Sequence, residues 1–280
     1  MTDFPSLVSV DWLKDRTADP GVVVLDSTYH LPNLNRDAKA EFADKHIPGA
    51  RFFDFDEKIK NPNHPAPHML PDAATFAIEV GALGIGNDHH VIAYDTVGGF
   101  SAPRCWWMFK AFGHDRVSVL NGGLRAWEAA GLPVTDEPAH FDHQPFSPDF
   151  RPERVISAAD LLKKLDEVTV IDARSEGRFH GTEKEPRPGL RSGHIPGSLS
   201  LPSSKLTDKE TGLMKTPEEL KALFEEAGLD TDNRIVTSCG SGVTASALAL
   251  GLHLIGRDDV AVYDGSWSEW GANEDLPIET

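Results

Sequence analysis

The chain has 280 residues, which is enough to bury two hydrophobic cores of ordinary size rather than one large core. Its formal net charge of -17 would repel a nucleic-acid backbone or an acidic membrane surface, so we expect neither as the main partner, although local arginines could still bind a small anion. No apolar stretch approaches the roughly 20 residues that span a bilayer, and residues 1–5 begin acidic and contain a proline instead of forming a secretory leader.

The first half of the chain alternates predicted helices and strands. A helix is expected to begin near Ser9, a residue type that caps helix N-termini. Residues 22–26 form an apolar run that ends in an aspartate, which is typical of a strand buried on both faces. Residues 132–154 contain five prolines and favour an extended connector, because proline disrupts regular helix. The expected organisation is a first domain over residues 1–138, a linker over 139–153 and a second domain over 154–280.

The chain has two cysteines, Cys105 and Cys239, which lie far apart in different sequence contexts. A structural disulfide is therefore not expected, and we interpret the chain as a soluble protein of a reducing compartment, the cytoplasm. Cys105 belongs to an apolar helical stretch over residues 104–109, where we expect it to be buried and chemically inert.

The order of parts in the first half recurs in the second half. Four landmarks recur at spacings of 143 to 148 residues, and chance motifs would not keep both order and spacing. The chain is therefore expected to contain a duplicated α/β domain, each copy being a small parallel sheet covered by helices on both faces. The landmark pairs are Asp26 with Asp172, His46 with His194, Asp95 with Cys239, and Trp127 with Trp270.

The clearest single helix is predicted in the second copy. Thr216 and Glu219 have the spacing of a capping box, and Pro217 would occupy the first helical position. An apolar stripe follows at helical spacing, so a helix is expected from this point onward.

A glycine-containing turn with the sequence Cys239-Gly240-Ser241-Gly242-Val243-Thr244 follows a short strand and precedes a long apolar helix. The glycines allow successive backbone N–H groups to point inward, and the helix adds its positive end, so the loop favours an anion. A thiolate at Cys239 would be stabilised there, which is the requirement for a nucleophilic cysteine. The alternative is that Cys239 is a small apolar filler at a strand end, but the glycine pattern favours the functional interpretation.

The first copy provides an internal comparison, since Asp95 stands where the second copy has Cys239. A carboxylate cannot replace a thiolate as an attacking sulfur. Only the second copy is therefore expected to be chemically competent at this loop, while the first copy supplies packing and one wall of the site.

The whole pattern resembles that of the rhodanese-type sulfurtransferases, and the resemblance covers nearly the whole chain. It rests on the Asp-ended strands, the His-Ile-Pro-Gly turns at His46 and His194, the closing Gly-x-x-x-Trp segments and the cysteine loop of the second copy. This loop and residues 177–187 are similar to the 3-mercaptopyruvate sulfurtransferase branch, whereas thiosulfate sulfurtransferases typically carry basic residues after the cysteine. The neutral Gly240 and Ser241 agree with the similarity to the 3-mercaptopyruvate branch, since they suit a substrate with one carboxylate better than a dianion.

The resemblance implies two tandem rhodanese-like domains and a transfer of sulfur from 3-mercaptopyruvate to Cys239, which leaves pyruvate, followed by transfer from the persulfide to a thiol or cyanide. Arg178 and Arg187 are expected to bind the carboxylate and keto oxygens of the substrate, the alternative being that they are solvated surface residues. Ser241 is either a hydrogen-bond or proton-relay partner of the departing carbon or a small turn residue. The residues whose N–H groups are expected to hold the sulfur are Gly240, Gly242, Val243 and Thr244.

In this family the histidine equivalent to His46 is implicated in a Ser-His-Asp relay, for which Asp37 is the acidic candidate here. His194 lies in the same turn of the second copy, however, and a residue repeated in both copies usually has a structural role. Both a catalytic and a structural interpretation of His46 and Asp37 therefore stay open at this point.

Other kinds of site find less support in the sequence. The twelve histidines show no metal-ligand spacing and there is no nucleotide-binding glycine motif, so neither a metal nor a cofactor is expected. A cysteine phosphatase of related fold would need a longer loop and an arginine six residues after the cysteine, where this chain has Ala245. The remaining alternatives are a thiosulfate:cyanide sulfurtransferase and a non-catalytic persulfide carrier that binds a partner protein. The expected sulfur acceptor is a thiol, and thioredoxin is an expectation from the family.

Overall fold

The computed structural model describes residues 4–229 and 233–280, so Met1, Thr2 and Asp3 of the expected acidic N-terminus lie outside the described residues. The chain forms two compact units, each assembled from segments that are separate in the sequence. The first unit contains Met1–Asn61, Leu70–Arg151 and Thr207–Met214, and the second contains Pro62–Met69, Pro152–Leu206 and Lys215–Thr280.

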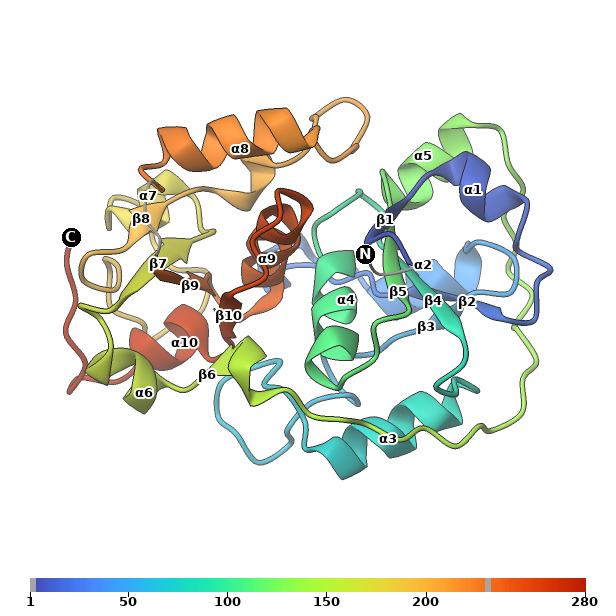
Figure 1. Ribbon diagram of the computed structural model, residues 1–280, viewed down its shortest axis with the longest axis horizontal. Helices are drawn as coiled ribbons and strands as arrows, with labels where there is room; N and C mark the ends of the chain where they lie inside the picture. The colour runs from blue at the N-terminus through green and yellow to red at the C-terminus, as the bar shows by residue number, and fades with distance from the viewer. Residues whose placement is uncertain (1–3, 230–232) are drawn as a thin grey trace. The chain divides into compact units, whose positions relative to one another are not determined.

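The first unit is built around a five-stranded parallel sheet (Figure 1). β4 is buried along its whole length, as expected for a central strand with helices on both sides. In spatial order the strands are β1 (Leu7–Val8), β5 (Val117–Leu120), β4 (His90–Tyr94), β2 (Val22–Asp26) and β3 (Arg51–Phe52). The helices are α1 (Val10–Lys14), α2 (Ala38–Asp44), α3 (Ala73–Ala82), α4 (Ala102–Ala111) and α5 (Gly123–Ala129), with a 3-10 turn, η1, at Pro32–Leu34.

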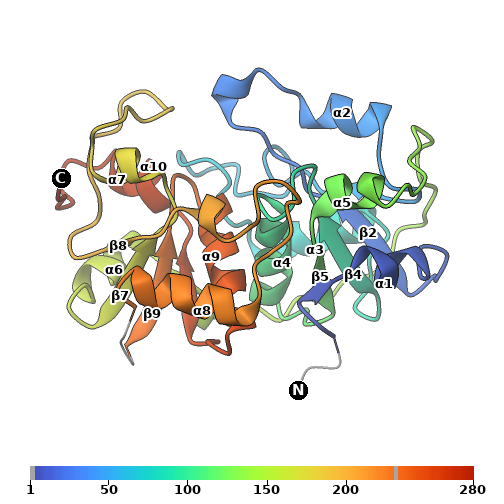
Figure 2. The same ribbon diagram turned by 90° about the horizontal axis from the view of Figure 1, so that it is seen from above.

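Helices cover both faces of this sheet (Figure 2). On one face, Trp127 of α5 belongs to the same apolar cluster as Ile92 and Tyr94 of β4 and residues of α1. On the other face, α4 packs against β4 and β5, and Phe76 of α3 stacks on Phe112 at 4.1 Å between ring centroids. Alternate side chains of β4 thus serve two separate helix layers, because the side chains of a strand point to opposite faces.

The second unit repeats the first, with the same strand order and parallel pairing. Trp267 and Trp270 of α10 and Leu161 of α6 form one apolar cluster, while α8 and α9 pack together. This repetition confirms the predicted duplication. The strands in spatial order are β6 (Val155–Ile156), β10 (Val260–Tyr263), β9 (Arg234–Ser238), β7 (Val168–Asp172) and β8 (Leu199–Ser200). The helices are α6 (Ala158–Lys163), α7 (Glu176–Phe179), α8 (Pro217–Glu226), α9 (Val243–Leu254) and α10 (Ser266–Trp270), with 3-10 turns η2 (Pro152–Arg154) and η3 (Ser203–Lys205).

Helices begin where the sequence predicts caps. The Oγ atom of Ser9 accepts the N–H of Trp12 at 3.1 Å. At the start of α8, Thr216 Oγ1 accepts the N–H of Glu219 at 3.3 Å, and Glu219 Oε2 accepts the N–H of Thr216 at 2.9 Å. These are the two reciprocal bonds of a capping box, which fix the first turn of the helix.

Two short segments belong to a different unit from the one that the expected boundaries imply. Residues 207–214 join the first unit, where the N–H of Met214 donates to Oδ1 of Asn121 at 2.7 Å. Residues 62–69 join the second unit, which brings a histidine-bearing segment of the first half of the chain to the second sheet. Such exchanges depend on contacts between distant residues and leave no periodic signal in the sequence.

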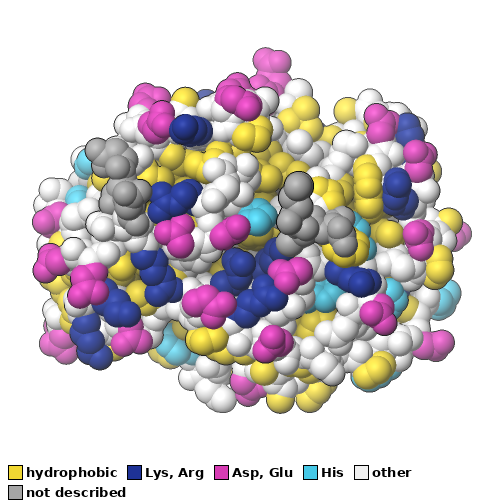
Figure 3. All heavy atoms as spheres, in the orientation of Figure 1, with side chains coloured by type: hydrophobic (Ala, Val, Ile, Leu, Met, Phe, Trp, Pro, Cys, Tyr) yellow, Lys and Arg dark blue, Asp and Glu magenta, His cyan; other side chains and the backbone are white. Residues whose placement is uncertain are grey.

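Residues 132–151 of the proline-rich connector form no helix or strand apart from one isolated bridge between Thr135 and His46, whereas its last three residues form the 3-10 turn η2. Across the ranges 4–229 and 233–280, no helix is both long and apolar enough to cross a membrane. On the face drawn in Figure 3, acidic side chains are scattered among basic ones rather than gathered in a single patch.

Candidate active site

Cys239 lies directly after β9, at the carboxyl end of a central strand, and is 1% exposed. The helix α9 follows with Gly242 as its N-cap, at a φ of +79° that favours glycine. The backbone N–H of Ser241 donates to Sγ of Cys239 over 3.4 Å. The thiol therefore occupies the strand-to-helix turn that the sequence predicts, with one backbone N–H directed at the sulfur.

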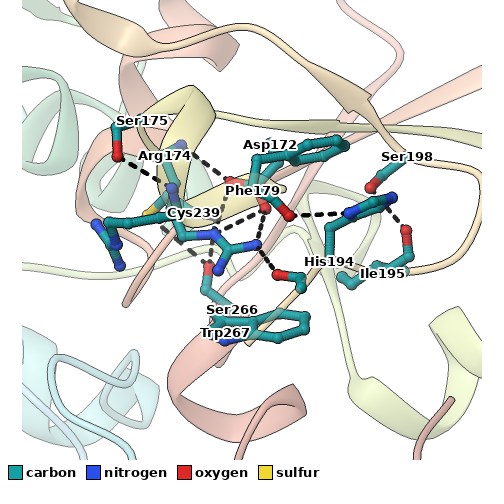
Figure 4. Close-up of polar contacts among 12 residues, drawn as sticks. Asp172, Arg174, Ser175, Phe179, His194, Ile195, Ser198, Cys239, Ser266 and Trp267 are labelled. Carbon is teal, nitrogen blue, oxygen red and sulfur yellow. Dashed lines mark hydrogen bonds and ion pairs between the residues drawn. The ribbon is translucent and has the colours of Figure 1, made fainter. Parts of the chain in front are cut away.

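The N-terminus of α10 holds the backbone of this cysteine loop. Ser266 Oγ accepts the N–H group of Cys239 at 3.1 Å (Figure 4). It also accepts the N–H group of Gly242 at 3.1 Å and donates to the carbonyl oxygen of Tyr263 at 2.8 Å. The next two residues of α10 donate their N–H groups to the carbonyl oxygens of Cys239 and Gly240 at 2.9 Å. Ser266 is fully buried with a φ of +49°, an unfavourable backbone conformation that its surroundings must stabilise.

The corresponding loop of the first unit shows what such a turn can bind. Asp95 follows β4, is 1% exposed, and directs its carboxylate into the loop. The N–H groups that it accepts are those of Val97 (3.1 Å), Gly98 (2.6 Å), Phe100 (2.9 Å), Ser101 (2.8 Å) and Ala102 (2.8 Å). A turn of this type thus gathers backbone N–H groups around one acceptor, and in the second copy the N–H of Ser241 is directed at Sγ of Cys239.

The imidazole of His68 lies beside the cysteine loop. Its Nδ1 atom is 3.0 Å from Oγ of Ser241, and both residues are buried in the second unit. His68 has a φ of +63°, which is rare for a residue with a side chain and is stabilised by its buried surroundings. The sequence analysis missed His68, because it lies in a proline-rich segment without helical or strand periodicity. No repeat or motif in the sequence distinguishes His68 from the other histidines that lie outside the repeated landmarks.

Arg178 is the predicted substrate-binding residue that the structure brings to the loop. A Cβ atom at residue 240 would lie 2.9 Å from Nη2 of Arg178, so the guanidinium occupies the space that a side chain at Gly240 would need. Glu185 holds this guanidinium from the other side, with its Oε2 accepting from Nη2 at 2.6 Å. The sequence analysis did not identify Glu185 as part of the site.

The other residues predicted at the site lie close to these in the chain. Arg187 is partly buried in the segment between α7 and β8. Val243 opens α9 and is buried, and Thr244 in the same turn of the helix is partly buried. The roles predicted for these three residues in holding the substrate or the sulfur stay predictions.

His46 and Asp37 belong to the first unit and have partners of their own. The ring nitrogens of His46 lie 2.7 Å from the carbonyl oxygen of Phe42 and 3.2 Å from that of Glu137, so neither is left for a hydroxyl group. Asp37 caps α2 by accepting the N–H groups of its first turn. Within the described parts of the chain no hydrogen bond joins Asp37 to His46.

The duplicated histidine shares two of the contacts of His46. The ring of His46 stacks on Phe42 at 4.2 Å, and the ring of His194 stacks on Phe179 at 3.8 Å. In each case Nδ1 faces the carbonyl oxygen of the stacked phenylalanine, at 2.9 Å for His194. These matching contacts support the structural interpretation of both histidines that the sequence left open.

Cys105 is fully buried in α4, and burial raises the pKa of its thiol well above the usual value. A thiol of this kind is a poor nucleophile at neutral pH. Both cysteines are free, as expected for a chain without a disulfide.

The chain matches known proteins over most of its length. The model of the rhodanese-like domain matches residues 9–130 and again residues 157–273. A 3-mercaptopyruvate sulfurtransferase from Mus musculus is 45% identical over 276 residues, which cover 95% of this chain and 92% of the relative. A thiosulfate sulfurtransferase from Cricetulus griseus is 43% identical over 287 residues, with the same two coverages of 95% and 92%.

A solved structure agrees with the sequence matches. The crystal structure of SseA from Escherichia coli, described as a 3-mercaptopyruvate sulfurtransferase, superposes with a TM-score of 0.85 at 38% identity. The superposition covers 94% of this chain and 99% of that one. Two matched domains, a shared fold and the high identity to whole relatives confirm the predicted resemblance, and the chain belongs to the rhodanese-like family.

Proposed function

We propose that the protein is a sulfurtransferase that takes sulfur from 3-mercaptopyruvate onto Cys239, releases pyruvate and passes the sulfur to an acceptor. The observation that carries this proposal is the meeting of three groups at one loop: the Cys239 thiol, the Ser241 hydroxyl beside an imidazole, and the guanidinium of Arg178. The relatives named for the same activity support it.

The proposed reaction has two steps. The thiolate of Cys239 attacks the substrate sulfur, an S–S bond forms as the C–S bond breaks, and the electron pair of that bond passes to carbon as the enolate of pyruvate. The proton of the substrate thiol then moves to this carbon, which completes pyruvate and leaves the persulfide on Cys239. In the second step a thiolate or cyanide attacks the terminal sulfur and regenerates the Cys239 thiolate.

Each residue of the site has a role in this proposal. Arg178 binds the substrate carboxylate, with Arg187 as a second cation for the keto oxygen, and both would stabilise the enolate charge. Ser241 passes the proton, and His68 orients and polarises its hydroxyl from 3.0 Å. A proton relay through His46 and Asp37 stays a prediction. The contact between His68 and Ser241 favours His68 over His46 as the histidine of a proton relay.

The neutral residues of the loop favour 3-mercaptopyruvate over thiosulfate. Gly240 and Ser241 follow the nucleophile without adding a cation, which suits one carboxylate better than a dianion. Thiosulfate:cyanide sulfurtransferase activity is the second candidate, since a relative named for thiosulfate is almost equally similar. A persulfide carrier without turnover is the third candidate.

The proposed acceptor is a thiol, such as that of a small reducing protein of the thioredoxin type, and the proposed location is the cytoplasm. A thiolate acceptor completes the sulfur transfer without a cofactor. A reducing compartment would keep both the acceptor and Cys239 as thiols.

One preparation tests the three candidates together. We expect pyruvate release from 3-mercaptopyruvate to exceed thiocyanate formation from thiosulfate and cyanide, and Cys239→Ser to abolish both. Mass spectrometry of the protein incubated with donor alone is expected to show a gain of one sulfur atom, absent in Cys239→Ser. Persulfide formation without pyruvate release would favour the carrier, and faster thiocyanate formation would favour the thiosulfate enzyme.

A further inference from the structure

Four charged side chains of the second unit form a chain of alternating sign that ends at the cysteine loop. Asp172, the last residue of β7, accepts two hydrogen bonds from Nε of Arg174 and one from Nη2 (Figure 4). Arg174 donates from Nη1 to Oε1 of Glu185 at 2.7 Å. Glu185 in turn accepts from Nη2 of Arg178 at 2.6 Å and from Nε at 3.2 Å.

The inner part of this chain of charges is buried. The side chain of Arg174 is fully buried, and its guanidinium lies over the ring of Trp267 at 4.3 Å. Burial alone would lower the pKa of Arg174, but the carboxylates of Asp172 and Glu185 raise it above the ordinary value. Glu185 itself is only 4% exposed, so its carboxylate is fixed between two cations instead of being solvated.

Glu185 leaves one edge of Arg178 available. It binds the Nε and Nη2 atoms, and within the described residues Nη1 of Arg178 makes no hydrogen bond. The side chain of Arg178 is 15% exposed, and Nη2 lies against Gly240 of the cysteine loop. A guanidinium held on one edge presents its remaining N–H groups in a fixed direction, which a free arginine side chain would not do.

The first copy shows that the fold does not need this chain of charges. Asp26 occupies the place of Asp172 at the end of the equivalent strand, but the residue two positions later is Thr28 instead of an arginine. The carboxyl group of Asp26 accepts the N–H of Thr28 at 2.8 Å and has no arginine in the place of Arg174, yet the sheet forms with the same strand order. Among the residues that the structure describes, this chain of alternating charges therefore occurs in the copy that carries the cysteine and not in the other copy.

We propose that Glu185 is a positioning residue that fixes the guanidinium of Arg178 for the substrate carboxylate beside Cys239. The inference rests on the proposed function, because the ligand of Arg178 is the carboxylate of 3-mercaptopyruvate or of its product. Glu185 does not touch the reacting atoms and acts only through Arg178. Its removal should weaken binding of a 2-oxo carboxylate and leave the reactivity of the thiol toward a neutral reagent unchanged.

The experiment uses the whole protein and measures protection of Cys239 against iodoacetamide by pyruvate, beside KM and kcat for 3-mercaptopyruvate. Glu185→Gln and Glu185→Asp are expected to raise KM and the half-protecting pyruvate concentration about tenfold, with a smaller change in kcat. Glu185→Asp keeps the charge beside Arg174 and is one methylene too short to reach both cations, so it tests the proposal even where Glu185→Gln destabilises the fold. The alkylation rate without pyruvate is expected to match the wild type.

Two comparisons separate positioning from a general structural effect. Glu183→Gln is the matched control, because Glu183 lies in the same segment, accepts a hydrogen bond from Ser175 at 2.7 Å and, among the described residues, forms no hydrogen bond or ion pair with an arginine. This variant should keep wild-type values. In an Arg178→Ala background, Glu185→Asp should add less than about twofold, since a positioning residue has nothing left to position.

The outcomes distinguish this inference from the proposed function. Equal protection by pyruvate in the wild type and both Glu185 variants overturns the role of Glu185, as do independent effects of Arg178→Ala and Glu185→Asp. A wild-type protein that pyruvate protects but that releases none from 3-mercaptopyruvate overturns the proposed function and leaves the role of Glu185 supported. No protection in the wild type overturns both.

Discussion

The Nδ1 atom of His68 lies 3.0 Å from the Oγ atom of Ser241, two positions after the cysteine. The histidine comes from the first half of the chain and the serine from the second, and 173 residues separate them in the sequence. A buried hydroxyl next to an imidazole can give or take a proton more readily than a hydroxyl in a plain turn. This contact therefore favours the proton-relay interpretation of Ser241 over the turn-residue interpretation.

Ser241→Ala and His68→Asn are each expected to lower kcat for pyruvate release about 10- to 100-fold, because proton transfer to the departing carbon loses its relay. The double variant should be no slower than the slower single variant, since the two groups act as one unit. Steady-state assays with 3-mercaptopyruvate measure this, with His180→Gln, an exposed histidine of the same unit, as control. Effects that multiply in the double variant would contradict a relay.

Ser266→Ala should destabilise the second unit by about 1–3 kcal/mol, because two buried N–H groups lose their acceptor. Ser266→Gly should be less destabilising than Ser266→Ala by about 1 kcal/mol, since glycine adopts a positive φ without strain. Both variants should lose most pyruvate release, because the cysteine loop is no longer held. Urea unfolding and activity measured on the same samples test this, and equal stability of the two variants would argue against strain at Ser266.

Gly240→Ala should raise KM for 3-mercaptopyruvate roughly 3- to 10-fold, because the new Cβ would displace Nη2 of Arg178. The fold should change in stability by less than about 1 kcal/mol, since the group displaced is the flexible end of a side chain. Gly86→Ala, whose Cβ would make only ordinary contacts from 3.5 Å outward, is the control. An unchanged KM with lower stability would show that the guanidinium does not serve the substrate.

Asp26 gives the first unit a pH-dependent stability. Burial raises the pKa of Asp26 to about 6, although hydrogen bonds from Thr28 oppose this shift. Folding therefore favours the protonated form of Asp26. The stabilisation that this form adds to the free energy of unfolding is present below pH 4 and is lost as the pH rises through 6. The free energy of unfolding of the wild type minus that of Asp26→Asn should fall by up to roughly 3 kcal/mol between pH 4 and pH 7. Denaturant unfolding at both pH values tests this, and a constant difference would contradict it.

Thr216→Ala should cost about 1 kcal/mol of stability, because α8 loses one of the two reciprocal bonds of its capping box. Pyruvate release should stay at the wild-type rate, since α8 carries none of the proposed site residues. Lys221→Ala on the exposed side of the same helix is expected to change stability by less than about 0.5 kcal/mol. A loss of activity in Thr216→Ala at a temperature where it is fully folded would contradict this separation.

The cysteine loop and the duplicated architecture could be predicted because their signals are local. Helix caps such as that at Thr216 depend on residues three positions apart, and a short apolar run predicts a buried strand. The recurrence of these short patterns in the same order was sufficient to predict two similar sheets. The comparison of Asp95 with Cys239 predicted from the sequence alone which copy is reactive.

The partners of the loop could not be predicted in the same way. His68 contacts Ser241, and Glu185 contacts Arg178, because the fold of the second unit brings separate chain segments together. His46 resembled a relay residue only through its sequence motif, and its ring faces a backbone carbonyl oxygen instead. By itself the sequence determined the duplication and predicted the cysteine loop and the arginine segment, since short-range hydrogen bonding and apolar periodicity depend on neighbouring residues. The tertiary structure alone decided which imidazole meets the serine and which carboxylate holds the arginine, because such pairings depend on where distant segments are brought together by packing.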